Sequence, residues 1–446
     1  MPALFGTDGV RGVANRDLTP ELAFALGRAA ATVISRGASG RPGLVVGRDT
    51  RSSGDMLAAA VAAGAASGGV DVADVGVLPT PGVAFLTVEL GLAGGAVVSA
   101  SHNPPEYNGI KFFSGDGMKL PDAVEDEMDR LVRGGDGLRP DGRGVGRIRP
   151  ATEPVDRYVD HLTASTETRL DGMKVVADCA HGAAHVIAPR ALRSLGADIE
   201  VIGAAPDGMN INVDVGATHP EAMADTVRTT GADAGVAFDG DADRALFADE
   251  TGELIDGDQV IAACALAMKE DGLLPKDTVV VTVMANLGFK VAMEGAGITV
   301  LETAVGDRFV LEEMIRGGAG LGGEQSGHVI FLDRATTGDG ILTAIRFLSL
   351  AARKGVPLSE LAAAMHRYPQ VLENVPASDP VAAADAPAVK GAVEAAERAL
   401  GERGRVLVRA SGTEPLVRVM VEAETEDEAQ RHARALVEVV TEASHA

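Results

Sequence analysis

The sequence is short of cysteine, of aromatic residues and of positive charge. Its 446 residues include two cysteines, Cys179 and Cys264, and no tryptophan, and aromatic residues make up 3% of the chain. Two cysteines cannot build a disulfide framework, so we expect a reducing compartment, the cytoplasm. Because 40 Lys and Arg stand against 64 Asp and Glu, the net charge is −24. This charge argues against nucleic acid and anionic membranes as partners.

Long apolar runs are missing too. No stretch approaches the ~18 uninterrupted apolar residues of a membrane span, and the first twelve residues lack the basic and apolar regions of a signal peptide. We therefore expect no membrane partner. Glycine is plentiful, with 55 residues, in a chain that is 46% hydrophobic. This composition indicates an α/β core of small residues with many loops that depend on glycine.

An internal repeat organises most of the chain. Three stretches share the order strand, helix, strand, helix, strand, and each ends in a polar loop: SASHNP at 99–104, DGDADR at 239–244 and GEQSGH at 323–328. Strands that alternate with helices predict mainly parallel sheets, and ligands bind beyond the carboxyl ends of such strands. We expect the three loops to converge on one cleft. Unrelated loops on duplicated domains are the alternative.

The C-terminal part does not repeat this pattern. It is predicted to form a helix over 382–401, two strands around a glycine loop, and a last helix from about Glu426. The stretch 143–154 is predicted to be a linker. The predicted fold class is α/β, with three similar α/β/α domains of mixed, mainly parallel sheets plus a smaller C-terminal α+β domain around a central cleft. The predicted domains are 1–150, 151–252, 253–366 and 367–446.

Three carboxylates at a spacing of two, Asp239, Asp241 and Asp243, predict a metal site. Oxygen donors this close repel one another unless a cation neutralises them. The spacing also fits the start of an EF-hand loop, but Arg244 stands where that loop needs glycine, and the flanks are predicted to be strands. A compact loop with few carboxylates suits Mg²⁺. The alternative is a solvated acidic turn.

The loop at 99–104 is a candidate site of covalent chemistry. Ser99 and Ser101 point to opposite faces if the strand continues, so at most one of them faces the cleft. Lys111 follows close by in the sequence. One reading is a nucleophilic or phosphorylated serine with a lysine for proton transfer or phosphate binding. The other is a Ser/Asn turn with capping hydroxyls.

Two further loops carry groups that suit a phosphorylated sugar. GEQSGH places several hydrogen-bonding side chains between glycines, which let the backbone approach a sugar closely; a plain polar turn is the alternative.

RASGTEP at 409–415, followed by Arg418, offers hydroxyls, backbone N–H groups and guanidinium groups to a phosphate. Its alternative is a β-turn with one surface arginine. The Arg-bearing loops at 5–12, 47–51 and 303–308 are weak signals by themselves.

Taken in order, FGTDGVRG, SASHNPPEYNGIKFF, DGDADR, GEQSGH and RASGTEPLVRV resemble the motifs of the α-D-phosphohexomutase superfamily over essentially the whole chain. The Gln of GEQSGH and the Gly of RASGTEP are most similar to the bacterial branch that acts on glucosamine phosphates. The resemblance implies that the enzyme interconverts glucosamine 6-phosphate and glucosamine 1-phosphate, a supply for UDP-N-acetylglucosamine and cell-wall synthesis. It also implies a phosphoserine and a glucosamine 1,6-bisphosphate intermediate.

The resemblance further implies a role for each motif residue. Ser101 matches the phosphoserine, and one Mg²⁺ is held by Ser101 together with the three aspartates. Lys111 matches a lysine for acid–base work. The remaining matches are the active-site residues His102, Arg11 and Arg244, the sugar-binding residues Glu324, Ser326 and His328, and the phosphate-binding residues Arg409, Ser411, Gly412, Thr413 and Arg418.

The implied partner is a small phosphosugar, and a homodimer is plausible for such relatives. Three other functions fit parts of the pattern. The nearest is a phosphomannomutase/phosphoglucomutase, because glucosamine differs from glucose only by an amine at C2. A Mg²⁺-dependent sugar phosphatase would release free phosphate instead of an isomer. A phosphosugar sensor without catalysis would carry no phosphorylated serine.

Overall fold

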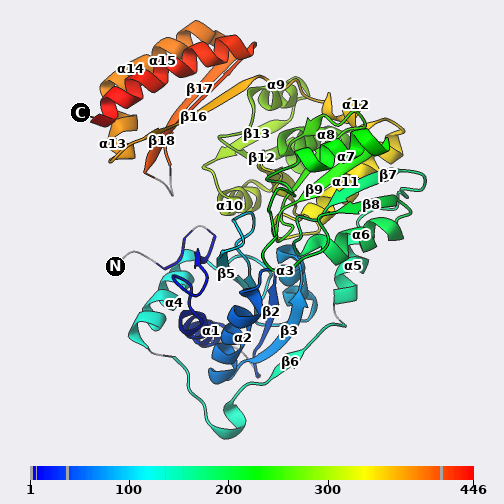
Figure 1. The fold of residues 1–446 in the computed structure, drawn as a ribbon, viewed down its shortest axis with the longest axis vertical. Helices are drawn as coiled ribbons and strands as arrows, with labels where there is room; N and C mark the ends of the chain where they lie inside the picture. Colours follow the sequence, from blue (N-terminus) through cyan, green and yellow to red (C-terminus); the bar gives the residue numbers. More distant parts are fainter. Residues whose placement is uncertain are drawn as a thin grey trace. The chain divides into compact units, whose positions relative to one another are not determined.

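The computed structural model describes residues 4–6, 8–36, 40–135, 137–153, 155–411 and 415–445 (Figure 1). The chain divides into two compact units. The larger unit combines Met1–Met284 with Ile298–Ala364, and the smaller combines Ala285–Gly297 with Met365–Ala446. No helix among the described residues has the length and apolar character needed to cross a membrane.

The first sheet of the larger unit has six strands in the order β1-β5-β4-β2-β3-β6. Strands β4, β2, β3 and β6 are parallel, β5 pairs antiparallel with β4, and β1 pairs antiparallel with β5. The strands are β1 (Val10–Val13), β2 (Gly43–Arg48), β3 (Asp71–Val77), β4 (Gly94–Val98), β5 (Tyr107–Ser114) and β6 (Ile148–Pro150). The helices are α1 (Pro20–Ile34), α2 (Gly54–Ser67), α3 (Thr80–Glu89) and α4 (Asp122–Gly134), with the short helix η1 (Gly142–Gly144).

The second and third sheets repeat this plan in the orders β11-β10-β9-β7-β8 and β13-β12-β14-β15. The second has β7 (Lys174–Asp178), β8 (Asp198–Ile202), β9 (Ala234–Phe238), β10 (Ala245–Ala248) and β11 (Leu254–Ile255), with helices α5 (Val155–Thr163), α6 (Ala184–Ser194) and α7 (Glu221–Thr230). The third has β12 (Thr278–Thr282), β13 (Thr299–Thr303), β14 (Leu321–Gly323) and β15 (Val329–Phe331). Its helices are α8 (Gly257–Glu270), η2 (Pro275–Asp277), α10 (Asp307–Gly317), α11 (Gly340–Lys354) and α12 (Leu358–Ala362).

The predicted repeat is confirmed by the strand order. In each sheet the first parallel strand of the repeat lies between the other two, as β3-β2-β4, β8-β7-β9 and β13-β12-β14. The third parallel strand then turns back into an antiparallel strand, which is β5, β10 or β15. The three polar loops join these strand pairs. Each loop therefore follows the carboxyl end of a parallel strand, where α/β folds place their ligands.

Small residues build the core of the first repeat. Helices α1 and α2 pack so closely that a Cβ atom on Gly27 would lie 2.1 Å from the carbonyl oxygen of Val61, and one on Gly64 would lie 2.1 Å from that of Phe24. Strands β4, β9 and β12 are buried along their whole length. Strands with both faces buried are apolar along most of their length, which explains runs such as TVVVT at 278–282.

The smaller unit has a three-stranded antiparallel sheet in the order β16-β18-β17. Its strands are β16 (Gln370–Pro376), β17 (Gly404–Ala410) and β18 (Leu416–Ala423), and its helices are α9 (Leu287–Gly295), α13 (Pro380–Asp385), α14 (Pro387–Leu400) and α15 (Glu426–His445), with η3 (Gly401–Arg403). The single helix predicted over 382–401 is wrong. Ala386 has an extended conformation before Pro387, and this ends α13 and starts α14.

The sequence prediction missed several strands, and two of them, β6 and β16, lie in segments for which no strand was expected. The predicted linker contains β6, which pairs in parallel with β3 at the edge of the first sheet. Strand β16 pairs with β18 from Gln370 to Pro376. In addition, residues 285–297, which the sequence analysis placed within 253–366, pack with the C-terminal residues in the smaller unit.

The fold class predicted from the sequence is confirmed. Three sheets with a parallel centre and antiparallel edges carry helices in the predicted alternation, and a smaller antiparallel sheet with helices follows.

Candidate active site

Ser101 and the aspartate loop meet, although 138 residues separate Ser101 from Asp239. The Ser101 hydroxyl donates a hydrogen bond of 2.5 Å to Asp239 Oδ2, and its oxygen lies 3.3 Å from His102 Nδ1. Ser101 is buried, and its φ of 51° is in the left-handed region, which L-residues rarely occupy. Such a conformation persists only where surrounding contacts hold it.

Three buried residues hold Ser101 in this conformation. Ser99 Oγ accepts a hydrogen bond of 2.9 Å from the Ser101 backbone N–H and donates one of 2.6 Å to Asp49. Asp49 also forms an ion pair of 2.9 Å with Arg51, and neither side chain is exposed. Ser99 thus faces away from the reactive position, so one serine of the pair supports the other.

Arg51 forms hydrogen bonds with four backbone carbonyl groups of the serine loop. Its guanidinium donates hydrogen bonds to the carbonyl oxygens of Ser101 (2.9 Å), Asn103 (2.8 Å) and Tyr107 (3.0 Å), and also to that of Pro104. Asn212 Nδ2 donates to the first two of these oxygens. The arginine loop at 47–51 gave only a weak signal in the sequence, and here Arg51 is a structural residue of the site.

The three aspartates form a compact, buried group in the loop between β9 and β10. One carboxylate oxygen from each lies within 4.8 Å of the others. Asp241 accepts a hydrogen bond from Thr80 Oγ1, but Asp241 Oδ1 and Asp243 Oδ1 are buried without a hydrogen-bond partner among the described residues. Burial, followed by repulsion from the other carboxylates, raises the pKa of Asp239 and Asp241.

This donor set fits a divalent cation. Unpaired carboxylate oxygens in a buried site cost free energy, and hard oxygen ligands are those that Mg²⁺ prefers. The strands on both sides of the loop agree with the rejection of an EF-hand, whose loop lies between helices.

Lys111 on β5 lies in the same region. Its Nζ is 3.3 Å from Asp307 Oδ2 at the start of α10, and both side chains are largely buried. Burial alone would lower the pKa of Lys111, but Asp307, Asp8 and the nearby aspartates of the loop outweigh it and raise this pKa. Lys111 is therefore cationic in this state. Asp307 lies in one of the weak arginine loops, 303–308, and sequence analysis did not single it out.

Three further residues set the electrostatics around Ser101. Burial, then the cationic Arg244 and Arg11, lowers the pKa of His102 to about 4, so His102 is neutral at physiological pH. Arg244 lies 3.8 Å from Asp243, and Arg11 lies 3.7 Å from Asp8. The Nε atoms of both arginines are buried without a hydrogen-bond partner in the part of the chain that the structure describes.

The loop at 323–328 lies beside the aspartate loop. His328 is buried, its Nε2 accepts from the Gly338 backbone N–H over 3.2 Å, and this atom lies 3.9 Å from Asp243 Oδ2. Glu324 accepts from the Gly306 backbone N–H over 3.0 Å and from the exposed Ser326 hydroxyl over 3.4 Å. The predicted convergence of the three loops is thus confirmed, whereas the roles of their residues stay predictions.

The candidate phosphate loop belongs to the smaller unit. Arg409 on β17 and Arg418 on β18 are directly opposite each other in the sheet. Burial, then the charge of Arg418, lowers the pKa of Arg409. Like charges at opposite positions destabilise a sheet unless an anion neutralises them. Ser411 follows β17, and Gly412 and Thr413 lie outside the described residues.

Comparison with known families defines the class of protein. Models of the phosphoglucomutase/phosphomannomutase family match in four parts: α/β/α domain I over residues 2–137, domain II over 156–252, domain III over 256–368 and the C-terminal domain over 372–439. The chain belongs to this family, within the phosphohexomutase superfamily.

Individual relatives narrow the comparison. The phosphoglucosamine mutase of Symbiobacterium thermophilum is 56% identical over 443 residues, which cover 99% of both chains. Among solved structures, a phosphoglucomutase/phosphomannomutase family protein of Burkholderia thailandensis has a TM-score of 0.82 at 26% identity, covering 99% of this chain and 98% of the other. An N-acetylphosphoglucosamine mutase of Aspergillus fumigatus, in complex with GlcNAc-6P and magnesium, shares the fold at 19% identity, with a TM-score of 0.72 and coverage of 99% and 95%.

Proposed function

We propose that this enzyme is a mutase that interconverts glucosamine 6-phosphate and glucosamine 1-phosphate through a phosphoserine at residue 101. The observation that carries this proposal is the 2.5 Å hydrogen bond between Ser101 Oγ and Asp239 Oδ2. It joins a serine in a constrained loop to a group of buried carboxylates with unpaired oxygens. The similarity to phosphoglucosamine mutases over the full chain supports the choice of sugar.

A phosphoenzyme solves the geometry of the reaction, because O1 and O6 lie on opposite sides of one sugar. In the first half-reaction, the free hydroxyl of the monophosphate attacks the phosphorus of phospho-Ser101, the bond between phosphorus and Oγ breaks, and the hydroxyl proton passes to Oγ. The product is glucosamine 1,6-bisphosphate. In the second half-reaction, Oγ attacks the other phosphorus, and the isomeric monophosphate leaves with the proton.

One Mg²⁺ per chain would be held by Asp239, Asp241 and Asp243 together with the Ser101 phosphoryl group. When bound, it supplies positive charge beside the oxygens on which charge accumulates during phosphoryl transfer. The protein contributes three buried carboxylates with oxygens within 4.8 Å of one another, and Asp241 Oδ1 and Asp243 Oδ1 have no hydrogen-bond partner among the described residues. The cationic Arg244 and Arg11 add positive charge around the same loop.

Lys111 and His102 are the groups suited to move the proton. Neutral His102 lies 3.3 Å from Ser101 Oγ, which is within reach for accepting its proton. Lys111 is cationic while it is paired with Asp307, and this suits a proton donor or a charge partner of the transferring phosphoryl group. Lys111 can act as a base toward the attacking hydroxyl only after it has lost its own proton.

The remaining roles concern substrate binding. We assign Glu324, Ser326 and His328 to the sugar hydroxyls, because their loop meets the aspartate loop. We assign Arg409 and Arg418, with Ser411, Gly412 and Thr413, to the phosphate that is not transferred, because a dianion would relieve the repulsion between the paired arginines. We retain the homodimer as a prediction that light scattering of the purified protein can check.

The test is to follow glucosamine 6-phosphate, glucose 1-phosphate and mannose 1-phosphate by phosphorus NMR with Mg²⁺ and a catalytic amount of hexose 1,6-bisphosphate. We expect isomerisation without release of inorganic phosphate, with kcat/KM highest for the glucosamine substrate. Faster isomerisation of the glucose or mannose phosphate would make the enzyme a phosphoglucomutase or phosphomannomutase, the family to which the Burkholderia thailandensis structure is assigned. Release of phosphate as the main product would contradict a mutase.

A further inference from the structure

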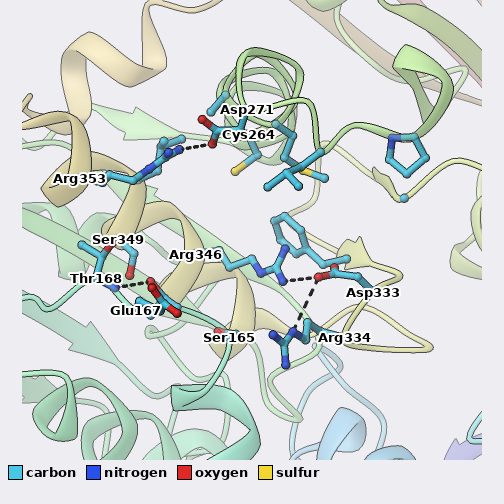
Figure 2. A pocket seen from close by; sticks show the side chains of 18 residues that line it. Ser165, Glu167, Thr168, Cys264, Asp271, Asp333, Arg334, Arg346, Ser349 and Arg353 are labelled. Carbon is cyan, nitrogen blue, oxygen red and sulfur yellow. Dashed lines mark hydrogen bonds and ion pairs between the residues drawn. The ribbon is translucent and has the colours of Figure 1, made fainter.

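A second pocket lies in the larger unit, separate from the candidate active site (Figure 2). Its volume is about 620 Å³, which is within the range of small-molecule sites. Helices α8 and α11, the segment 165–168 and the residues that follow β15 line it. None of the catalytic or binding residues assigned above is among the lining residues.

Two polar groups of the pocket have no hydrogen-bond partner among the described residues. Ser349 Oγ and Arg346 Nε are both buried, and both residues lie on α11. Residues three apart on a helix are neighbours on one face, with Cβ atoms about 5–6 Å apart. A hydroxyl and a guanidinium N–H that line one pocket, and that have no partner among the described residues, are each suited to bind an anionic oxygen.

Arg346 is held in place within the pocket. Its guanidinium donates a hydrogen bond of 2.7 Å to Asp333 and stacks over Phe331, 4.7 Å from the ring centroid. Figure 2 shows Arg346 reaching into the pocket toward Asp333. A cation fixed by a carboxylate and an aromatic ring loses little conformational entropy when it binds a ligand.

The remaining lining limits the charge and shape of a ligand. The arginines at 334, 346 and 353 are balanced by Asp271, Asp333 and Glu167, and Arg353 is paired with Asp271 over 2.7 Å. A lining without net charge does not favour a sugar phosphate or a nucleotide, which carry two or more negative charges. Apolar side chains complete the wall, among them Cys264 and Leu350, which are nearly inaccessible to solvent.

We propose that this pocket binds a small organic acid with one carboxylate and a compact apolar body. The carboxylate accepts hydrogen bonds from Arg346 Nε and Ser349 Oγ, and the apolar body packs against Phe331, Leu350 and Cys264.

Helix α11 connects this pocket to the aspartate loop. Its first residue, Gly340, donates a backbone hydrogen bond of 3.0 Å to the carbonyl oxygen of Ala242 between the candidate metal ligands. Ser349 lies about 14 Å further along the helix axis. The organic acid and the phosphosugar therefore occupy different places, and both can be bound at once.

Hexanoate is the probe, and hexanol is the matched control without the charge. Ligand-observed NMR on the full chain with Mg²⁺ should detect hexanoate with a Kd of about 1 mM, as expected for a ligand of this size, and hexanol at least about tenfold weaker. Saturating glucosamine 6-phosphate should leave hexanoate bound. Displacement by glucosamine 6-phosphate, or no binding up to about tenfold above the expected Kd, would overturn the proposal.

Variants locate the site. Arg346→Lys keeps the charge but removes Nε–H, and it should weaken hexanoate binding about tenfold. Ser349→Ala removes only the hydroxyl, and it should weaken binding about fivefold. Arg353→Lys, at the paired and half-exposed rim, should change it less than about twofold. Thermal melting checks that each variant folds. If Arg346→Lys does not fold, Ser349→Ala alone tests the site. Unchanged affinity in a folded Ser349→Ala protein would contradict the assignment.

Discussion

The hydroxyl of Ser99 accepts a hydrogen bond of 2.9 Å from the backbone N–H of Ser101, two residues further along the chain. Ser99 in turn donates to Asp49, which is paired with Arg51, and Arg51 binds the Ser101 carbonyl oxygen. Both backbone polar groups of Ser101 are therefore fixed by buried side chains. This arrangement keeps the left-handed conformation that presents Ser101 Oγ to Asp239.

Ser99→Ala should lower kcat about tenfold and leave KM within about twofold, because the substitution loosens the position of the reacting oxygen without removing a group that binds substrate. Steady-state kinetics with glucosamine 6-phosphate measures both constants. Ser67→Ala, which removes a hydroxyl bonded to the carbonyl oxygen of Gly64 within α2, is the matched control and should be neutral. A raised KM with unchanged kcat would contradict the positioning role of Ser99.

Ser101→Ala should lower kcat by about 10⁴-fold or more, because no other hydroxyl is assigned to carry the phosphoryl group. Phosphorus NMR measures the turnover, and intact mass before and after incubation with a hexose 1,6-bisphosphate measures the phosphate on the protein. The wild type should gain one phosphate and the variant none. Circular dichroism should show that the variant is folded. Substantial activity in a folded variant would remove Ser101 from the mechanism.

Asp241→Asn should weaken Mg²⁺ binding and lower turnover at limiting Mg²⁺ by about 10²-fold, with partial recovery at high Mg²⁺. Without the metal, the same variant should be more stable than the wild type by about 1 kcal/mol, because one of three buried like charges is gone. Calorimetric titration and melting in a chelator measure the two effects. If both Mg²⁺ affinity and metal-free stability were unchanged, the aspartates would not be the metal site.

Arg409→Gln should raise KM for glucosamine 6-phosphate by about 10- to 100-fold, because a charged partner of the phosphate that is not transferred is lost. The phosphorylation of Ser101 by a hexose 1,6-bisphosphate at saturation should still reach completion. Arg405→Lys provides a control on the same strand, since Arg405 Nε pairs with Glu422 over 3.1 Å. The assignment of Arg409 fails if the two variants have equal KM values.

Glu125 on α4 should make the protein less stable as the pH rises from about 4.5 to 7. Burial raises the pKa of its carboxyl to about 7 despite Lys119 at 3.7 Å. In this pH range the folded state binds more protons than the unfolded state, so the free energy of unfolding falls with rising pH. Glu125→Gln should remove this contribution. At pH 8 the variant should be more stable than the wild type by about 1 kcal/mol, a figure that allows for the remaining contact of the Glu125 carboxyl with solvent. Urea melts at pH 5 and pH 8 compare the two proteins, and an equal pH dependence would contradict the prediction.

Much of the architecture follows from local pattern. Largely apolar runs such as TVVVT at 278–282 predict buried strands, and the alternation with helices predicts the parallel pairing that β13, β12 and β14 adopt. The spacing of the three aspartates also predicts a metal site, whereas the choice of Ser101 over Ser99 came only from the resemblance to a family. In these places the physical signal lies within a few consecutive residues, so the tertiary structure and the local sequence agree.

Other features were decided only when distant segments met. Lys111 and Asp307 are 196 residues apart, and nothing in either segment alone indicates that their charges pair. Strand β6 has three residues, too few for a periodic pattern, and it exists because β3 offers an open edge. Arg51 is indistinguishable from a surface arginine until the carbonyl oxygens of the serine loop surround it. Residue type and spacing thus determined which groups are available for catalysis, whereas burial and long-range contacts decided which are neutral, which are charged and which only hold others in place.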